Sequence, residues 1–467
     1  MNHSQAESFD PVYRPEAMTV PEIGAGVGVI DRQNEKYLGE KIYREINKHL
    51  VVVQDPWLED QLNQIFTRIT SQTNLGQPLG LLLINDKQVN AFAVPGGVFA
   101  LNTGLLKLAK NTDEVASVMS HEIAHVTQRH YSRSQEAFKG QGLLALAGIL
   151  VGAAIATQSD GQAGSAVMLG TQAALLDKQL SYSRNQEREA DRIGMQYMVA
   201  AGFNPNSMAD FFERMQRSTT QLSFMPEFWL THPLTTQRMS EARLRARQYP
   251  QVKPNLLDSN YDIIRWYAMV LSNDTSEQEL VTLAPQNQAV KLALTAFYNR
   301  QGDYQKALSI LNSATAEMQQ LPLAILIKTD SYIGLKQYDQ AYHTIIKPQQ
   351  IMPENRAYSY KLAQVLIRQQ KYSQAQELVK RILKDRPRDI GGWDLMVQAA
   401  SLDQKSEIQA INVLRYRAEV QFWSGGEEAG IKSLLHAQRL AKNNNSLSGT
   451  IEIRLKQMQQ ERLYNLS

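Results

Sequence analysis

The chain has 467 residues, a length that suggests roughly two to four domains. Its hydrophobic fraction of 43% is enough to form buried cores, and its net charge of +3 gives no reason to expect a nucleic-acid partner. The sequence contains no cysteine, which excludes disulfides, iron–sulfur clusters, cysteine-ligated zinc and a cysteine nucleophile. Any metal must therefore be bound by His, Asp or Glu.

Residues 1–30 form a polar N-terminal extension that contains several prolines. It has no basic start followed by an apolar run, so no signal peptide is visible in this chain. Two interpretations remain open on composition alone. Either a signal peptide has already been removed, or the protein is cytoplasmic.

Helical periodicity begins near Asp31 and continues to about Gln72, with Leu38, Ile42 and Ile46 on one apolar face. Three short apolar runs follow, and polar residues, glycine and proline separate them. These features predict a small β-sheet. The predicted strands are residues 79–85, 90–95 and 98–102.

A second predicted helix runs from about Thr112 to about Arg133. Its start is indicated by Thr112, which can act as an N-cap, and by Asp113 and Glu114 in the first turn. The pattern H-E-x-x-H lies inside this helix.

On that helix His121 and His125 lie at positions i and i+4, so they share a face and their imidazoles can converge on one ion. Neutral histidine binds zinc with bonds of about 2.0–2.1 Å. Glu122 lies beside this face, close enough to reach a water bound to the metal. The pattern is therefore typical of zinc hydrolases, although five residues with three fixed positions are weak evidence alone.

His130 follows His125 by five residues and lies off its face. We therefore exclude it as a metal ligand. With Arg129 and Arg133 it is expected to complement the C-terminal end of the helix dipole.

Residues 135–180 are rich in Ala, Gly and Leu, and we interpret them as an apolar helical hairpin. The most apolar part, residues 143–157, has 15 residues, whereas a membrane-spanning helix needs about 20. The hairpin is either an ordinary packed helix pair or an element that covers a site or contacts membrane-protein clients. Unchanged client binding and cleavage after its deletion would count against the second interpretation.

A catalytic zinc needs three protein ligands and one open position. A helix predicted at residues 183–202 carries two acids on one face, Glu187 and Asp191. Glu189 points toward the other side, about 200° around the helix from Glu187. We expect Glu187 to bind the metal and Asp191 to accept a hydrogen bond from a ligating histidine. The alternative is a charged helix whose acids pair with its arginines, Arg184, Arg188 and Arg192.

From about residue 256 the sequence is typical of helical repeats. Residues of three kinds recur at a spacing of 34: Tyr304, Tyr338 and Tyr372; Ala307, Ala341 and Ala375; and Pro353 and Pro387. An aromatic residue followed three positions later by Ala, at this period, is the tetratricopeptide pattern. We predict an α-solenoid with a concave surface for a partner protein, the alternative being a generic helical bundle.

The H-E-x-x-H pattern and the later E-x-x-x-D pattern resemble the HtpX/CAAX-prenyl-protease superfamily of zinc metallopeptidases. Residues 90–106 are similar to that family's edge strand and turn, and residues 231–238 to its His-Pro…Arg segment. With C-terminal tetratricopeptide repeats and no membrane span, the chain most resembles the BepA-like branch, the periplasmic β-barrel assembly-enhancing proteases of Gram-negative bacteria.

The resemblance implies a mainly α (α+β) fold. A gluzincin-type zinc peptidase domain with a small β-sheet would occupy residues 31–255, and tetratricopeptide repeats residues 256–467. It implies one zinc ion per chain, with His121, His125 and Glu187 as its ligands.

The resemblance also assigns roles around the metal. Glu122 would be the general base that activates water, and Asp191 either a proton donor or the residue that orients His121. His232 would stabilise the oxyanion or occupy the open zinc position and keep the enzyme shut, unless it is only a turn residue before a proline. The remaining assignments are weaker: Arg238 as an oxyanion stabiliser or a carboxylate partner, and Asn90 and Phe92 near a substrate strand added along residues 90–94.

The implied function is a zinc-dependent endopeptidase with chaperone-like activity in the periplasm. It would hydrolyse misfolded or stalled outer-membrane β-barrel proteins and promote their assembly. The repeats would contact these clients and their assembly machinery, with a peripheral contact to the outer membrane. The membrane helices of HtpX and the prenyl proteases have no counterpart here, so their substrates are not carried over.

Two alternatives belong to other classes of protein. The chain could be mainly a chaperone or adaptor with a latched, largely inactive zinc site in which His232 is the fourth ligand. A purely structural repeat scaffold would require every member of the predicted zinc site to be there by accident.

Overall fold

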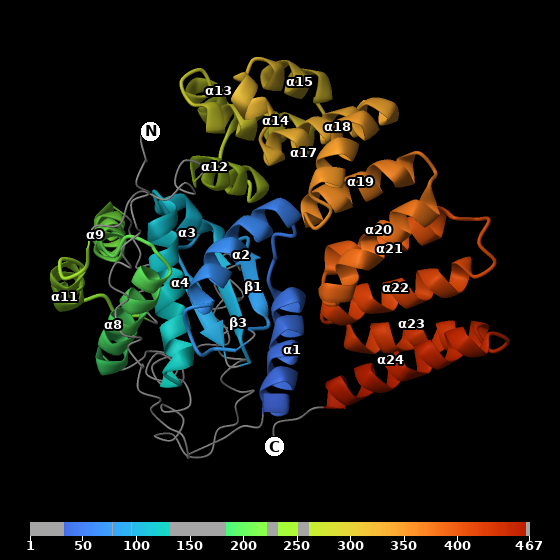
Figure 1. The fold of residues 1–467 in the computed structure, drawn as a ribbon, viewed down its shortest axis with the longest axis horizontal. Coiled ribbons are helices and arrows are strands. Elements are labelled where there is room, and N and C mark those ends of the chain that lie inside the picture. Colours follow the sequence, from blue (N-terminus) through green and yellow to red (C-terminus); the bar gives the residue numbers. More distant parts are fainter. Residues whose placement is uncertain are drawn as a thin grey trace, which may run out of the picture.

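The computed structural model describes residues 32–76, 78–94, 96–130, 184–221, 232–250 and 261–463. The predicted N-terminal extension, the apolar hairpin and the predicted domain boundary near residue 255 lie outside these residues. Figure 1 shows a mixed part, coloured blue to green, and an arc of helix pairs, coloured yellow to red. The predicted fold class, a small sheet among helices followed by a helical solenoid, is confirmed.

A three-stranded sheet lies at the centre of the mixed part. Strand β3 (Val98–Asn102) is in the middle, parallel to β1 (Gly80–Ile84) and antiparallel to β2 (Ala91–Val94). The side chains of Leu82, Ile84 and Phe92 pack with helix α1 (Arg32–His49), whereas Leu81 and Ala93 belong to the core on the opposite face. Both faces are buried, which explains why the strands are almost continuously apolar.

The predicted helical stretch from Asp31 to about Gln72 is divided into two helices. The structure has α1 and a separate helix α2 (Pro56–Thr70), because Val52 pairs with Ile84 at the edge of the sheet. Asp55 then starts α2: its side chain accepts a hydrogen bond from the Leu58 amide, and Pro56 occupies the first helical position.

Helix α4 (Thr112–Thr127) crosses the core behind the sheet and packs against α8 (Arg184–Ala200). Its N-cap is Asn111, one residue before the expected cap, and it ends before the predicted Arg133. The end is caused by Arg129, whose φ of 52° is left-handed and cannot continue an α-helix. The other helices of this part are α3 (Thr103–Leu108), α9 (Asn206–Gln221) and α11 (Thr236–Ala246).

The remaining helices form the arc seen in Figure 1. Their bounds are α12 (Tyr261–Leu271), α13 (Glu277–Leu283), α14 (Gln288–Gln301), α15 (Tyr304–Asn312), α16 (Ala316–Gln319), α17 (Pro322–Gly334), α18 (Tyr338–Ile351), α19 (Arg356–Arg368), α20 (Tyr372–Asp385), α21 (Ile390–Leu402), α22 (Gln409–Trp423), α23 (Glu427–Leu440) and α24 (Asn445–Leu463).

The periodic residues have the places in this arc that the repeat pattern predicts. The three tyrosines each begin the second helix of a pair, and the three alanines are fully buried. A Cβ atom on Gly334 of α17 would lie 2.3 Å from the Tyr304 ring, so this tyrosine does fill the gap between consecutive repeats.

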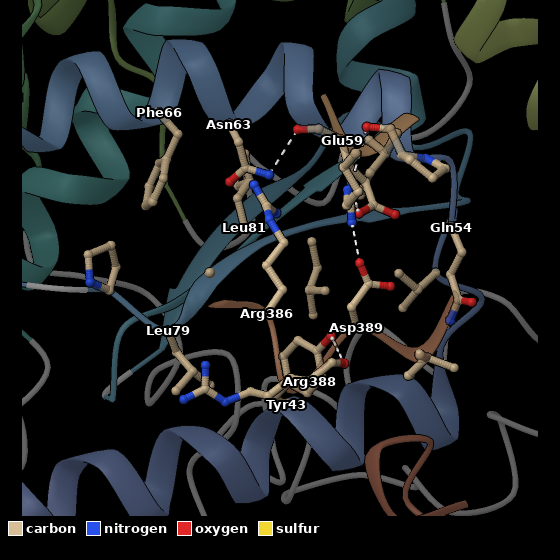
Figure 2. A pocket seen from close by; sticks show the side chains of 18 of the residues that line it. Tyr43, Gln54, Glu59, Asn63, Phe66, Leu79, Leu81, Arg386, Arg388 and Asp389 are labelled. Atoms are coloured by element: carbon tan, nitrogen blue, oxygen red, sulfur yellow. Dashed lines mark hydrogen bonds and ion pairs between the residues drawn. The ribbon is translucent and has the colours of Figure 1, made fainter. Parts of the chain in front are cut away.

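Ion pairs made by the buried Arg356 join the arc to the mixed part. The guanidinium of Arg356, on α19, lies 2.7 Å from Glu59 and 3.2 Å from Asp60 on α2, and 2.8 Å from Asp389. A pocket lies beside this network, and Figure 2 shows Arg386 and Asp389 of the arc facing Glu59 on α2 and Leu81 on β1 across it. These contacts hold the solenoid against α2 and the sheet edge.

No helix in the part of the chain that the structure describes is both long and apolar enough to span a membrane.

Candidate metal centre

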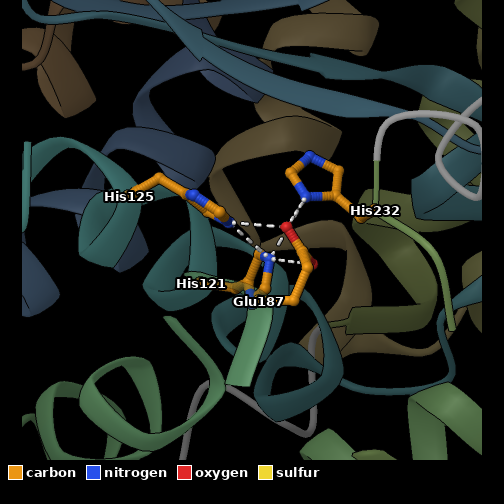
Figure 3. A group of neighbouring side chains, drawn as sticks. All are labelled: His121, His125, Glu187 and His232. Carbon is orange, nitrogen blue, oxygen red and sulfur yellow. Dashed lines mark hydrogen bonds and ion pairs between the residues drawn. The ribbon is translucent and has the colours of Figure 1, made fainter. Parts of the chain in front are cut away.

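Four buried side chains from three segments converge on the side of the sheet opposite α1. His121 and His125 come from α4, Glu187 from α8, and His232 from the segment that leads into α11. Each offers one ligand atom, and these atoms all lie within 4.8 Å of one another. Figure 3 shows the rings and the carboxylate pointing toward a common centre.

Four of the spacings within this cluster are close to those around a tetrahedral zinc ion, and all of its ligand atoms lie within 4.8 Å of one another. The Nε2 atoms of His121 and His125 are 3.0 Å apart, and Glu187 Oε1 lies 3.3 Å from the latter and 3.1 Å from His232 Nδ1. The distance from His121 Nε2 to His232 Nδ1 is 3.4 Å. Ligand atoms on a tetrahedron with zinc bonds of about 2.0–2.1 Å are separated by roughly 3.3–3.4 Å. The donor set, imidazole nitrogen and carboxylate oxygen, suits the same ion.

The close approach of α8 to α4 brings the two halves of the centre together. Gly194 of α8 lies against the α4 backbone, where a Cβ atom would be 3.0 Å from the His121 amide nitrogen and 3.0 Å from the Ser120 carbonyl. Glycine suits this crossing because a Cβ atom would require the two backbones to move apart by a few tenths of an ångström. The crossing sets Glu187 and Asp191 beside His121.

The charges of the centre also favour a cation. Glu122, Glu187 and Asp191 are buried carboxylates, and Arg238 is the buried guanidinium that faces them. A divalent ion would balance the charge of this group, and buried charges need such compensation. Burial lowers the pKa of the His121 imidazole, but hydrogen bonds to Asp191 and Glu187 outweigh it and raise that pKa to about 9.

Asp191 lies next to the metal cluster without belonging to it. Its Oδ1 is 3.0 Å from His121 Nδ1, and Arg238 donates to it from Nε (2.7 Å) and Nη2 (2.8 Å). Burial raises the pKa of the Asp191 carboxyl, but the Arg238 guanidinium outweighs this and holds it below its ordinary value. An ionised carboxylate only accepts hydrogen bonds, so Nδ1 of His121 donates to Asp191, and Nε2 is the nitrogen that can bind a metal once it gives up its proton.

Glu122 lies beside the cluster and contributes no atom to it. Its carboxylate accepts a hydrogen bond from the Ala93 amide of strand β2, and its Oε1 is 3.4 Å from His232 Nε2. Burial raises the pKa of the Glu122 carboxyl. His232 thus bridges the two glutamates, with Nδ1 toward Glu187 and Nε2 toward Glu122.

The structure places the weaker candidates as follows. Nη1 of Arg238 lies 2.7 Å from Glu187 Oε2 and donates to the Pro233 carbonyl at 2.9 Å, so this guanidinium is occupied by carboxylates and backbone. The Asn90 side chain accepts from the Ala91 amide at 2.9 Å, at the end of strand β2. The Phe92 side chain packs on the α1 face of the sheet, so only its backbone can border the centre.

The expectation that His130 complements the helix C-terminus is wrong, although its exclusion from the metal cluster agrees with the structure. His130 is fully buried, with Nδ1 2.9 Å from His125 Nδ1 and Nε2 3.1 Å from Glu189 Oε2. The helical phase misplaced it because α4 ends at Thr127, and the left-handed Arg129 returns the chain toward α8.

Comparisons with known proteins identify the families that this chain resembles. Residues 55–246 match the model of peptidase family M48, and residues 332–399 match a tetratricopeptide repeat model. The chain is 28% identical over 465 residues to the beta-barrel assembly-enhancing protease of Escherichia coli (strain K12), covering 96% of this chain and 93% of that protein.

Two further relatives match over different lengths. A putative beta-barrel assembly-enhancing protease of Vibrio cholerae is 30% identical over 452 residues, covering 90% of each chain. The mitochondrial metalloendopeptidase OMA1 of Schizosaccharomyces pombe is 35% identical over 159 residues, covering 34% of this chain and 44% of that protein.

Proposed function

Because this chain belongs to peptidase family M48 and, within it, to the beta-barrel assembly-enhancing proteases, we propose that it cleaves peptide bonds with one zinc ion per chain, held by His121, His125 and Glu187. The chain is a metalloprotease. The observation that carries the choice of zinc is the convergence of buried imidazole nitrogens and a carboxylate oxygen within 4.8 Å of one another.

Zinc, when bound, supplies Lewis-acid chemistry that lowers the pKa of a bound water and polarises the scissile carbonyl. Glu122 is the general base: it removes the proton from the attacking water and returns it to the leaving amine. Its burial suits this role, because the raised pKa makes the carboxylate a stronger base. Asp191 keeps His121 in the tautomer that binds metal.

The substrate lies as an added strand along the outer edge of β2, with its backbone beside Asn90 and Phe92. Ala93 supports this path, since its amide points out of the sheet toward Glu122. An added strand requires an extended chain, so unfolded or stalled proteins are the expected substrate class. Arg238 acts mainly by holding Asp191 and Glu187, and the weaker role as an oxyanion stabiliser would require it to leave them.

The clients follow from the named relatives. We expect misfolded or stalled outer-membrane β-barrel proteins in the periplasm, met through the repeat solenoid together with their assembly machinery. A chaperone-like activity that promotes assembly would use the same solenoid surface, and a peripheral contact with the outer membrane is part of this expectation.

A second candidate state is a latched enzyme. Nδ1 of His232 faces the other ligand atoms of the cluster, and its Nε2 lies 3.4 Å from Glu122. His232 therefore occupies the space between the ligands and Glu122 that the attacking water must take. In this state the protein would act mainly as a chaperone or adaptor, and cleavage would begin only after the segment carrying His232 moves.

Replacing His232 with alanine is expected to raise casein cleavage about 10-fold or more, because a minor open state is typically populated to roughly 10% or less. Bound zinc should remain at the wild-type level, since three ligands are unchanged. Initial cleavage rates with and without a chelator measure the effect, and His436→Ala, at an exposed histidine of the repeats, is the control. A fall in activity to the level of the chelated enzyme would instead give His232 the oxyanion role.

A further inference from the structure

We propose that His130 and Glu189 form a positioning chain that fixes the tautomer of His125 and so strengthens metal binding. The inference rests on the proposed metal centre and adds to it two residues that do not touch the metal. Asp191 performs the corresponding task for His121 by a direct contact.

The direction of each hydrogen bond in the series from Glu189 through His130 to His125 is set by Glu189. Glu189 is a carboxylate and can only accept, so Nε2 of His130 donates to it over 3.1 Å. The neutral imidazole of His130 then has its lone pair on Nδ1, which lies 2.9 Å from Nδ1 of His125. His125 must donate from Nδ1, and its Nε2 is left with a lone pair that faces the cluster.

The local backbone is shaped to hold His130 in this place. Arg129 has a φ of 52°, a left-handed conformation that ends α4 and turns the chain back toward α8. The Gln186 amide donates to the His130 carbonyl at 3.1 Å, so α8 holds both the backbone and the ring of His130. Left-handed residues also end other helices of the chain, at Asn273, Lys336 and Gln370, so the distinctive feature of this turn is the fully buried histidine that it returns onto a ligand.

Helix α8 thus supports the centre from two faces. On the face toward the cluster, Glu187 supplies one of the ligand atoms and Asp191 contacts His121. Glu189, whose side chain is 17% exposed, lies about 200° around α8 from Glu187 and reaches His130 from that other side. Partners of this kind typically change metal affinity by about 10- to 100-fold when they are removed.

The test measures zinc affinity of the full chain by competition with a chromophoric chelator, together with the visible spectrum of the Co²⁺-loaded protein. His130→Leu removes the acceptor and is expected to weaken zinc binding by about 10- to 100-fold and to alter the Co²⁺ bands. His130→Asn puts an amide oxygen near the former Nδ1 position and should stay within about 3-fold of wild type. Arg192→Gln, at an exposed residue of α8, is the matched control.

Two results would overturn the proposal while leaving the metal centre intact. One is wild-type affinity in His130→Leu, and the other is an equal loss in His130→Leu and His130→Asn, which would indicate packing alone. If His130→Leu does not fold, Glu189→Leu and Glu189→Gln carry the same comparison, because only the amide retains an acceptor for His130. Absence of zinc binding in the wild type would instead contradict the proposed centre itself.

Discussion

Replacing Glu122 with glutamine is expected to reduce the rate of peptide hydrolysis by about 10²–10⁴-fold, because general-base catalysis contributes that much and glutamine cannot accept the proton. Metal content should not change, since Glu122 is not among the four clustered ligand residues. The substitution preserves shape and can still accept from the Ala93 amide, so the fold should be retained. The measurement is kcat for casein or a fluorogenic peptide, together with zinc content.

The experiment is best done in two backgrounds. A latched site would keep the wild-type rate low and so reduce the measurable difference between wild type and Glu122→Gln. The substitution is therefore also made in the His232→Ala background. Glu241→Gln, on helix α11, is the control for a change of charge outside the centre. Comparable cleavage by Glu122→Gln and its parent at equal zinc content would rule out Glu122 as the base.

Replacing Arg238 with methionine is expected to lower the free energy of unfolding by about 3–5 kcal/mol. The substitution leaves Asp191 and Glu187 buried without their guanidinium partner, and breaking a buried ion pair on one side has this cost. The melting temperature should fall by roughly 6–20 °C if the domain unfolds as a unit of this size. Thermal unfolding followed by circular dichroism, with chelator in every sample, measures the effect without a contribution from bound metal.

Arg243 provides a matched control on the same helix. It also pairs with two carboxylates, Asp210 at 2.7 Å and Glu213 at 2.6 Å, but its side chain is 28% exposed and those of its partners 43%. Arg243→Met should therefore cost less than about 1 kcal/mol. Equal losses in the two variants would contradict the account of Arg238, and lost activity with unchanged stability would favour the oxyanion role.

The parts of this protein that follow a regular period could be predicted from the sequence. The 34-residue spacing of tyrosine and alanine predicted the repeats, because each repeat buries the same positions. Three members of the metal cluster could also be predicted, because His121 and His125 lie at a helical spacing and helical geometry separates Glu187 from Glu189 on α8.

The features that were missed depend on the places where regular structure ends. The break between α1 and α2 arises from a tertiary pairing of Val52 with Ile84, which no local propensity contains. His130 was misplaced because a helical wheel extended past Thr127 gives the wrong direction once Arg129 is left-handed. The position of His232 between Glu122 and Glu187 depends on how distant segments meet, so spacing along the chain could only suggest alternatives.

The central claim is that His121, His125 and Glu187 hold one zinc ion, and metal content per chain tests it most directly. The measurement is elemental analysis of the purified full chain after zinc loading and gel filtration, for the wild type and for a variant with both His121→Ala and His125→Ala, with circular dichroism to establish that both are folded. The account predicts about one zinc per wild-type chain and less than about a tenth of that in the variant. No bound metal in the folded wild type, or equal zinc in both proteins, would contradict it.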